Sequence, residues 1–251
     1  MVAGSVQDKV ALVIGGAGGI GAATARMLAE GGARVAITHT PRSAGKAADI
    51  VAALPGTGHI ALPADVAETA SLHELRQRVT AWSGGTLHIL VNSAGFTKPV
   101  PHGDLEALDD ALIDRMFAVN WRGQFAAIRL FAPMLTASGD GLIVSISSIA
   151  GQTGQGSSIA YCAAKAGIDA MTKSLARVLA PAVRVMGVAP GVVDTNFVPG
   201  RDAAFNATTA QSTPLKRVAT ADDVAEAVMA CATSLRFATG TTLAIDGGRS
   251  L

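Results

Sequence analysis

Short apolar runs alternate with longer amphipathic segments along the chain, which predicts strands and helices in regular alternation. The apolar runs are continuous, so the strands are expected to be buried on both faces of a parallel sheet. Seven strands are predicted, at Val10–Ile14, Val35–Thr38, His59–Pro63, Leu87–Val91, Leu142–Ser147, Val183–Val188 and Thr241–Ile245. The main helices are predicted at Ala22–Glu30, Ser43–Ala53, Leu105–Met134, through Tyr161 to about Leu179, and Thr220–Cys231. The fold class is therefore α/β, a doubly wound parallel sheet flanked by helices.

Composition narrows the class of protein. The chain has 251 residues, 49% of them hydrophobic and 16% charged, which suits one domain over residues 1–251 with a large core. A net charge of +1 without a basic run gives no reason to expect nucleic acid or a membrane surface as partner. No signal peptide or spanning segment is recognised, and Cys162 and Cys231 have no metal-ligand spacing. We expect a cytoplasmic protein without a metal site.

The candidate chemistry centres on residues 148–165. Tyr161 and Lys165 are four residues apart, so on a helix the ammonium lies on the same face as the phenol. A nearby cation is expected to lower the phenol pKa from about 10 and so favour proton transfer at neutral pH. Ser148 follows a predicted strand, where its hydroxyl can hold a carbonyl oxygen. Cys162 is expected to pack in the core, because it points away from this face.

A glycine cluster follows the first strand and precedes the first helix, where a loop can cradle a phosphate. Gly15 allows the tight turn, Gly19 lets backbone approach a pyrophosphate, and Gly21 lets the helix pack closely. The residues between them, Gly18 and Ile20, lie at the expected helix start, whose dipole favours an anion.

The end of the second strand is where a dinucleotide fold selects its cofactor. His39, Thr40 and Arg42 stand there with Ser43, and no carboxylate is present to bind a ribose 2′-hydroxyl. Hydroxyls and a guanidinium suit a 2′-phosphate, so NADP(H) is favoured and NAD(H) stays possible.

Further polar or small residues fall at the carboxyl ends of other predicted strands, where ligands of such sheets bind. Asp65 could accept from an adenine amino group, cap the next helix, or do both. Asn120 could bond to backbone or perturb its helix and fix a water near Lys165. The other candidates for cofactor contact are Val66, Asn92, Ala94, Gly95, Pro190, Gly191, Val193 and Thr195.

A mixed segment at 196–214 is the candidate for a mobile lid over the substrate. The substrate pocket is expected to include Ser148, Gln155, Tyr161, Gly191 and Val192. Arg201 in the lid could pair with a carboxylate or phosphate, but a solvated loop charge is favoured.

Together these motifs resemble the short-chain dehydrogenase/reductase family over essentially the whole chain, and most resemble its 3-oxoacyl-carrier-protein reductases. The motifs, in chain order, are Gly15-x-x-x-Gly19-Ile20-Gly21, Asp65-Val66, Asn92-Ser93-Ala94-Gly95, Asn120, Ser148, Tyr161-x-x-x-Lys165, Pro190-Gly191-x-x-x-Thr195 and Asp246-Gly247-Gly248. The resemblance implies a Rossmann-type fold. Two positions depart from the family pattern, Ile14 in place of a Thr and Ser93 in place of a second Asn, and both are expected to cost hydrogen bonds near the cofactor.

The resemblance also implies roles for the candidate residues. Tyr161 would be the general acid or base, Ser148 would hold the substrate oxygen, and Lys165 would bind the nicotinamide ribose. Asn120 would hold a proton-relay water. A homo-oligomer, either a tetramer or a dimer, is implied, with the helix at Trp121–Leu130 and the C-terminal Gly247–Leu251 as candidate contacts.

The expected activity is an NADP(H)-dependent oxidoreductase that transfers hydride between nicotinamide and a ketone or secondary alcohol, either a 3-oxoacyl group or a small ketone. Two alternatives stay open. One is an NAD-linked sugar, polyol or hydroxy-acid dehydrogenase, and the other is a nucleotide-binding scaffold or redox sensor without turnover.

Overall fold

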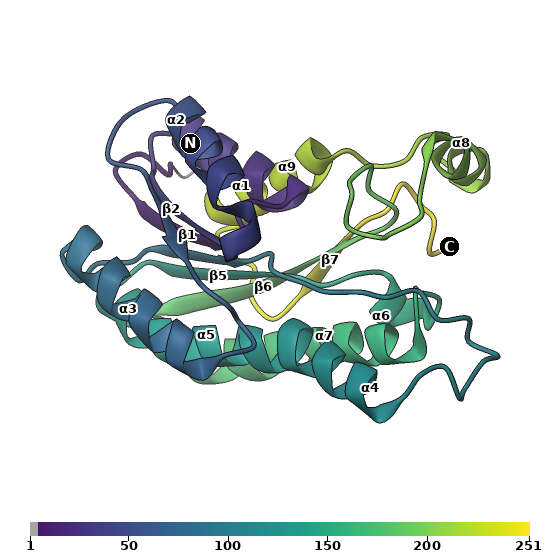
Figure 1. Ribbon diagram of the computed structural model, residues 1–251. Coiled ribbons are helices and arrows are strands. Elements are labelled where there is room, and N and C mark those ends of the chain that lie inside the picture. The colour runs from purple at the N-terminus through teal and green to yellow at the C-terminus, as the bar shows by residue number, and fades with distance from the viewer. Residues whose placement is uncertain (1–4) are drawn as a thin grey trace.

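Seven apolar segments form the parallel strands of one sheet in the computed structural model, which describes residues 5–251 (Figure 1). Every residue of β1 and β5 is buried, as expected of strands covered on both faces. The strands are β1 (Val10–Ile14), β2 (Arg34–His39), β3 (Ile60–Pro63), β4 (Ile89–Asn92), β5 (Gly141–Ile146), β6 (Val183–Pro190) and β7 (Thr242–Ile245). The seven predicted strands are thus confirmed, with ends that shift by one or two residues.

The strand order is β3-β2-β1-β4-β5-β6-β7, and every pairing is parallel. The chain winds outward from β1 in both directions, so the order reverses between β1 and β4. A crevice forms at the carboxyl ends of the strands on either side of such a reversal. The register pairs Ile14 with Asn92 and Asn92 with Ser145, which brings three strand ends together there.

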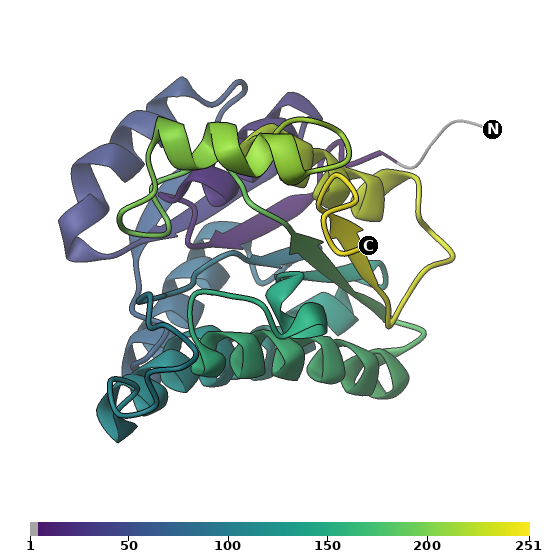
Figure 2. The same cartoon turned by 90° about the vertical axis from the view of Figure 1, so that its right-hand side faces the viewer.

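Helices cover both faces of the sheet, and Figures 1 and 2 show the three layers edge-on. One face carries α1 (Gly19–Glu30), α2 (Ala44–Ala53) and α9 (Ala221–Thr233). The other carries α3 (Thr69–Ser83), α4 (Asp110–Phe117), α5 (Gly123–Ala137), the short α6 (Ala150–Thr153) and α7 (Ile159–Leu179). Two large apolar clusters fill the layers, one on each side of the sheet. The doubly wound α/β fold predicted from the sequence is therefore confirmed.

The predicted helix at Leu105–Met134 is wrong in its first part and interrupted in its middle. Residues 101–109 are not helical, and Leu105 is exposed. Helix α4 begins after Asp109, whose carboxylate accepts a hydrogen bond from the Leu112 N–H at 2.7 Å. A π-helical turn at Ala118–Arg122 then separates α4 from α5.

The predicted helix through Tyr161 is confirmed. It begins at Ile159, where the Ser158 hydroxyl caps it by accepting from the Tyr161 N–H at 3.2 Å. One of the two interpretations of Asp65 is wrong. Asp65 does not cap α3. Its carboxylate instead accepts from the Ala67 N–H at 2.9 Å, and that helix starts at Thr69.

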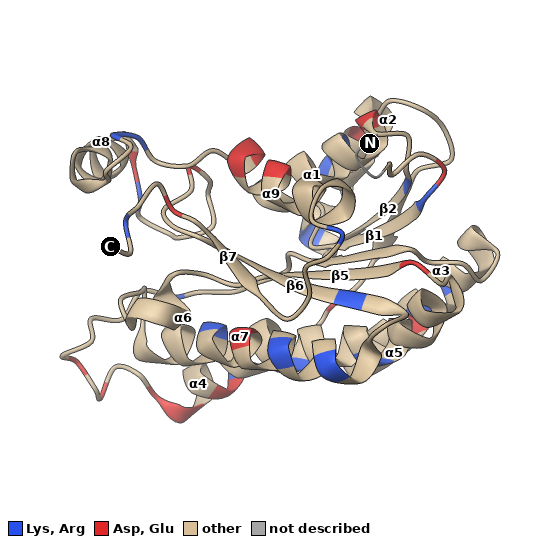
Figure 3. Ribbon diagram, turned by 180° about the vertical axis from the view of Figure 1, so that it is seen from behind, with Lys and Arg blue, Asp and Glu red and all other residues tan. Residues whose placement is uncertain are grey.

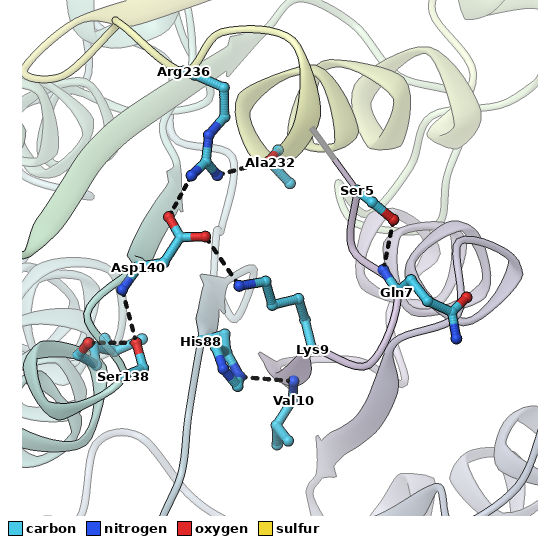
Figure 4. Close-up of polar contacts among 10 residues, drawn as sticks. Ser5, Gln7, Lys9, Val10, His88, Ser138, Asp140, Ala232 and Arg236 are labelled. Atoms are coloured by element: carbon cyan, nitrogen blue, oxygen red, sulfur yellow. Dashed lines mark hydrogen bonds and ion pairs between the residues drawn. The ribbon is translucent and has the colours of Figure 1, made fainter. Parts of the chain in front are cut away.

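The amino end of the sheet is tied by a small ionic cluster (Figure 4). The Asp140 carboxylate, just before β5, accepts from Lys9 at 3.0 Å and from Arg236. These partners lie just before β1 and after α9, so one carboxylate joins three segments that are distant in the sequence. The cluster lies at the opposite end of the strands from the crevice.

Segment 196–214 contains α8 (Ala203–Ser212), which projects beyond the sheet beside the C-terminal tail (Figure 1). The Thr220 hydroxyl caps α9, as predicted, by accepting from the Asp223 N–H, and the Asp223 carboxylate accepts from the Thr220 N–H. Among residues 5–251, no helix has both the length and the apolar character that a membrane crossing requires.

Candidate active site and dinucleotide site

A cavity of about 1040 Å³ opens at the carboxyl ends of the strands. It collects residues from the glycine loop, from the ends of β4, β5 and β6, from α7 and from the segment that includes α8. The predicted site residues that line it are Gly18, Gly19, Ile20, Gly95, Ser148, Gln155, Tyr161, Lys165, Pro190, Gly191, Val192, Val193 and Thr195. The sequence motifs thus converge on one cavity large enough for a dinucleotide and a small substrate.

Tyr161 and Lys165 lie on the first turns of α7, and the Lys165 ammonium is 5.6 Å from the phenol ring centroid. Lys165 is buried, and its Nζ donates to the Ile146 carbonyl at the end of β5 at 2.8 Å. Ser148 follows that strand and lines the same cavity as Tyr161, where its hydroxyl acts to lower the pKa of the phenol. The helix start and the strand end therefore bring the three predicted side chains together.

Burial controls the ionisation of this group. It raises the pKa of Tyr161 to about 12, although the Ser148 hydroxyl and the charge of Arg201 act in the opposite direction. Burial also lowers the pKa of Lys165 to about 8, against the effect of Asp169. The expectation that Lys165 lowers the phenol pKa is therefore not met in this site. The cost of burying a phenolate outweighs the attraction of the Arg201 charge.

Asn120 is buried inside the π-helical turn. Its amide nitrogen donates to the carbonyls of Phe96, at 2.8 Å, and Met116, at 2.9 Å, and its oxygen accepts from the Phe96 N–H at 3.2 Å. The predicted perturbation of the helix is confirmed, and Asn120 also fixes the loop that follows β4. Its side chain does not line the cavity.

The glycine loop has the geometry of an anion cradle. Gly15 has a φ of 80°, and a Cβ there would lie 2.5 Å from the Ala94 nitrogen. A Cβ on Gly21 would lie 2.3 Å from the Gly15 carbonyl oxygen, so both positions require glycine. No side chain caps the start of α1, whose first residues line the cavity. Free N–H groups and the helix dipole there suit a pyrophosphate.

The predicted selector residues lie at the outer end of β2 and its following turn. Thr40 and Arg42 are exposed, and the Thr40 carbonyl accepts from the Ser43 hydroxyl at 3.2 Å and contacts the His39 ring at 3.0 Å. Lys46, on the first turn of α2, lines the cavity although the sequence reasoning did not select it. Its position four residues after Arg42 is the signal that could have identified it.

Asn92 lies at the end of β4 beneath the cavity and is fully buried. Its amide nitrogen is 3.5 Å from the Ser145 hydroxyl, and its oxygen has no protein partner in the described chain. The neighbouring Ile14 side chain belongs to the apolar core and offers no hydrogen bond. This agrees with the expected loss of a hydrogen bond at Ile14, and the departure at Ser93 stays a prediction.

Asp65 and Val66 follow β3, and the Val66 carbonyl packs against the start of α5, where a Cβ on Gly123 would lie 2.6 Å from it. Thr195 lies against the glycine loop, with its methyl group 2.7 Å from the position of a Cβ on Gly19. The predicted residues that do not line the cavity are Gly15, Gly21, His39, Thr40, Arg42, Asp65, Val66, Asn92, Ala94 and Asn120.

Arg201 is not the solvated loop charge that the sequence favoured. It is half-buried, lines the cavity, and lies over the Phe205 ring at 4.7 Å. Phe197, with its ring centroid 6.3 Å from that of Tyr161, and Arg249 line the same cavity and were missed. Nothing local in the sequence marks these residues, because the fold alone brings α8 and the C-terminal tail to the site.

Cys162 is buried, and burial raises the pKa of its thiol, as expected of a packing residue. Within residues 5–251, no group of three or more His, Cys, Asp or Glu side chains could hold a metal ion.

The comparisons with known proteins agree with this geometry. A family described as enoyl-(acyl carrier protein) reductase matches residues 15–250. The cis-4-hydroxycyclohexanecarboxylate dehydrogenase of Sinomonas cyclohexanicum is 40% identical over 245 residues, which cover 96% of each chain. The protein described as ketoacyl reductase 2 of the granaticin polyketide synthase in Streptomyces violaceoruber is 37% identical over 253 residues, the full length of both chains.

A solved short-chain dehydrogenase/reductase from Serratia marcescens superposes with a TM-score of 0.87 at 34% identity, over 98% of this chain and 99% of its own. The chain belongs to the short-chain dehydrogenase/reductase family. It is accordingly an NAD(P)-dependent oxidoreductase that acts on secondary alcohols or ketones. The glycine cradle and the uncapped start of α1 fit the nicotinamide dinucleotide that the family uses.

Proposed function

We propose that the protein is an NADP(H)-dependent ketone reductase or alcohol dehydrogenase with Tyr161 as its general acid and base. The observation that carries this proposal is the convergence of Ser148, Tyr161 and Lys165 on the cavity that also contains the uncapped start of α1. A bound nicotinamide supplies or accepts the hydride, and the chain supplies binding, orientation and a proton.

The neutral phenol of Tyr161 is the group that gives a proton to the substrate oxygen during reduction. Its raised pKa keeps the proton in place until a negative charge develops on that oxygen. The Ser148 hydroxyl holds the same oxygen, and the Lys165 ammonium stabilises the phenolate left behind. Asn120 holds the loop at Phe96 and, by this proposal, orders a relay water beside Lys165.

The cofactor preference is proposed from charge. Arg42 and Lys46 are exposed cations one helical turn apart, flanked by the hydroxyls of Thr40 and Ser43. A ribose 2′-phosphate would gain from both cations, whereas a 2′-hydroxyl has no carboxylate partner among the residues at the end of β2. NADP(H) is therefore the favoured cofactor, and NAD(H) is the alternative.

The substrate end of the cavity is proposed to include Ser148, Gln155, Gly191 and Val192, under a lid formed by 196–214. These residues are small, apolar or uncharged, which suits a ketone carbon frame. The relatives' names contain both a cyclic hydroxy acid and a ketoacyl group, so a small hydroxy acid is the second candidate beside a 3-oxoacyl substrate.

A cytoplasmic homo-oligomer, either a tetramer or a dimer, is also proposed. Trp121 of the π-helical turn and Phe125 of α5 are half-buried and stack at 5.8 Å, and the tail Gly247–Leu251 is exposed from Arg249 onward, so both can contact a second copy. Light scattering of the purified protein tests this part of the proposal. A monomer at micromolar concentration would contradict it.

The test of the cofactor proposal is fluorescence titration of the purified protein with NADPH and NADH. We expect tighter binding of NADPH, and a larger loss for NADPH than for NADH in Arg42→Ala and in Lys46→Ala. Tighter binding of NADH would reverse the cofactor assignment and favour polyol or hydroxy-acid oxidation. No binding of either would favour a scaffold without turnover.

A further inference from the structure

The outer part of the cavity contains two cations that the proposed reaction does not use. Arg201 precedes α8 and Arg249 belongs to the C-terminal tail, yet both line the cavity with Ser148 and Tyr161. Figure 3 shows basic residues beside α8 and in that tail on the same side of the molecule. Arg249 Nη1 donates to the Ser212 hydroxyl at 2.9 Å, which directs its guanidinium toward α8.

Neither arginine forms an ion pair within residues 5–251. The nearby carboxylates are held by other groups. Asp202 accepts from the Phe205 N–H at 2.8 Å, and Asp194, the one acid that lines the cavity, accepts from the Asn206 amide at 2.9 Å. Asp246 accepts from two backbone N–H groups of the tail. The two guanidinium groups are therefore left to a ligand.

This arrangement is unfavourable without an anion. Arg201 is half-buried against the Phe205 ring, and burial lowers the pKa of its guanidinium. Tyr161 acts to raise this pKa, and Arg249 acts to lower it. The half-buried charge of Arg201 lies in the same cavity as that of the exposed Arg249, and an anion bound between them would offset their repulsion. A guanidinium fork matches a carboxylate in two parallel hydrogen bonds, and Arg201 is fixed in place by its ring contact.

We propose that Arg201, supported by Arg249, binds a carboxylate on the substrate, so that the enzyme acts on small ketones or secondary alcohols that carry a carboxylic acid. The inference rests on the proposed reaction at Tyr161, because the carboxylate lies at the other end of the substrate from the reacting oxygen. Phe197, whose ring lies beside Tyr161, and Phe205, under Arg201, then flank the apolar frame between the two ends.

The activity test compares 4-oxocyclohexanecarboxylate with its neutral carboxamide. We expect the wild-type enzyme to prefer the acid in kcat/KM. Arg201→Gln should lower kcat/KM for the acid by about tenfold or more, mainly through KM, because it removes one partner of a partly buried charge pair. The carboxamide should be affected far less, and Arg201→Lys should restore part of the loss. An equal effect on both compounds would overturn the proposal.

The matched control is Arg34→Gln. Arg34 is also half-buried and lies 4.7 Å over an aromatic ring, that of Trp82, but at the start of β2 and outside the cavity. It should leave the preference for the acid unchanged. If Arg34→Gln also lost the preference for the acid, the preference would depend on the overall charge of the protein, which would contradict the role of Arg201.

A binding test separates this inference from the proposed reaction. Calorimetric titration is carried out with NADP⁺ present. In the wild type and in Tyr161→Phe, we expect binding of cyclohexanecarboxylate and no binding of cyclohexanecarboxamide. In Arg201→Gln, we expect no binding of the carboxylate. If the protein bound the carboxylate but showed no turnover, the anion site would be supported and the proposed reaction would not. No discrimination between the acid and the amide would overturn it. If Arg201→Gln lost activity only toward acetoacetyl-CoA, Arg201 would instead be assigned to binding the phosphates of a coenzyme A thioester.

Discussion

The side-chain amides of Asn120 and Gln124 are both buried on neighbouring turns but differ in their hydrogen-bond partners. We therefore expect different effects on stability when each is replaced. Asn120 makes four hydrogen bonds, two with the backbone of Phe96 and two with Met116. Gln124, four residues later and equally buried, makes none through its amide within the described chain. Asn120→Ala is therefore expected to destabilise the fold, whereas Gln124→Met is expected to leave the stability unchanged or raise it.

The magnitude follows from the groups left without partners. Asn120→Ala leaves the Phe96 N–H, the Phe96 carbonyl and the Met116 carbonyl without their amide partner, which costs about 2–4 kcal/mol in total, with partial relaxation. For a chain of 251 residues this corresponds to a Tm lower by about 5–15 °C. Gln124→Met preserves the volume and removes unpaired polar atoms, so its free energy of unfolding should change by less than about 1 kcal/mol.

Thermal unfolding followed by circular dichroism measures both variants at one pH and protein concentration. Equal losses of stability in the two variants would refute the reasoning, because burial of an amide would then matter and its hydrogen bonds would not. An unchanged Tm in Asn120→Ala would refute the assignment of Asn120 as the anchor of the loop after β4.

Three further predictions follow from charges in the structure. Asp140→Asn should lower the Tm at pH 7 by about 2–4 °C, since its two partly exposed ion pairs together contribute about 1 kcal/mol. Burial would raise the pKa of Asp140, but Lys9 and Arg236 hold it below its usual range, so this stabilisation is present above about pH 4 and is lost as the pH falls through the folded pKa. Tyr161 is the single tyrosine of the chain, so the ultraviolet absorbance of tyrosinate should report a pKa well above 10, and a midpoint at or below 10 would contradict its burial. Arg201→Gln should raise that midpoint further, because it removes a positive charge that lowers the pKa of Tyr161.

The strands could be predicted closely because each contains a short apolar run, which is buried throughout in β1, β4 and β5 and only partly in β3 and β7. The start of α4 could not, because a single side chain sets it. Asp109 caps that helix at Asp110, although the predicted helix began at Leu105. The interruption at Ala118–Arg122 was anticipated only as an effect of Asn120, and the hydrogen bonds of Asn120 with Phe96 were not predicted.

The site was predictable where its residues follow strands or share a helix turn, as Ser148, Tyr161 and Lys165 do. The anion-binding end was not, because Arg201 and Arg249 are separated by 48 positions and meet only through α8 and the tail. The ionisation of Tyr161 was also mispredicted. The spacing of Tyr161 and Lys165 shows that a cation is near the phenol, but it does not show how far burial raises the phenol pKa.

Catalysis by the Tyr161 phenol is the central claim, and the Tyr161→Phe variant tests it most directly. Ketone reduction is measured with NADPH, and NADPH affinity is measured in the same preparation. The account predicts that kcat falls by about 10²–10⁴-fold, because the substrate oxygen loses its proton donor, while NADPH binds almost as before. Turnover equal to that of the wild type would contradict the account.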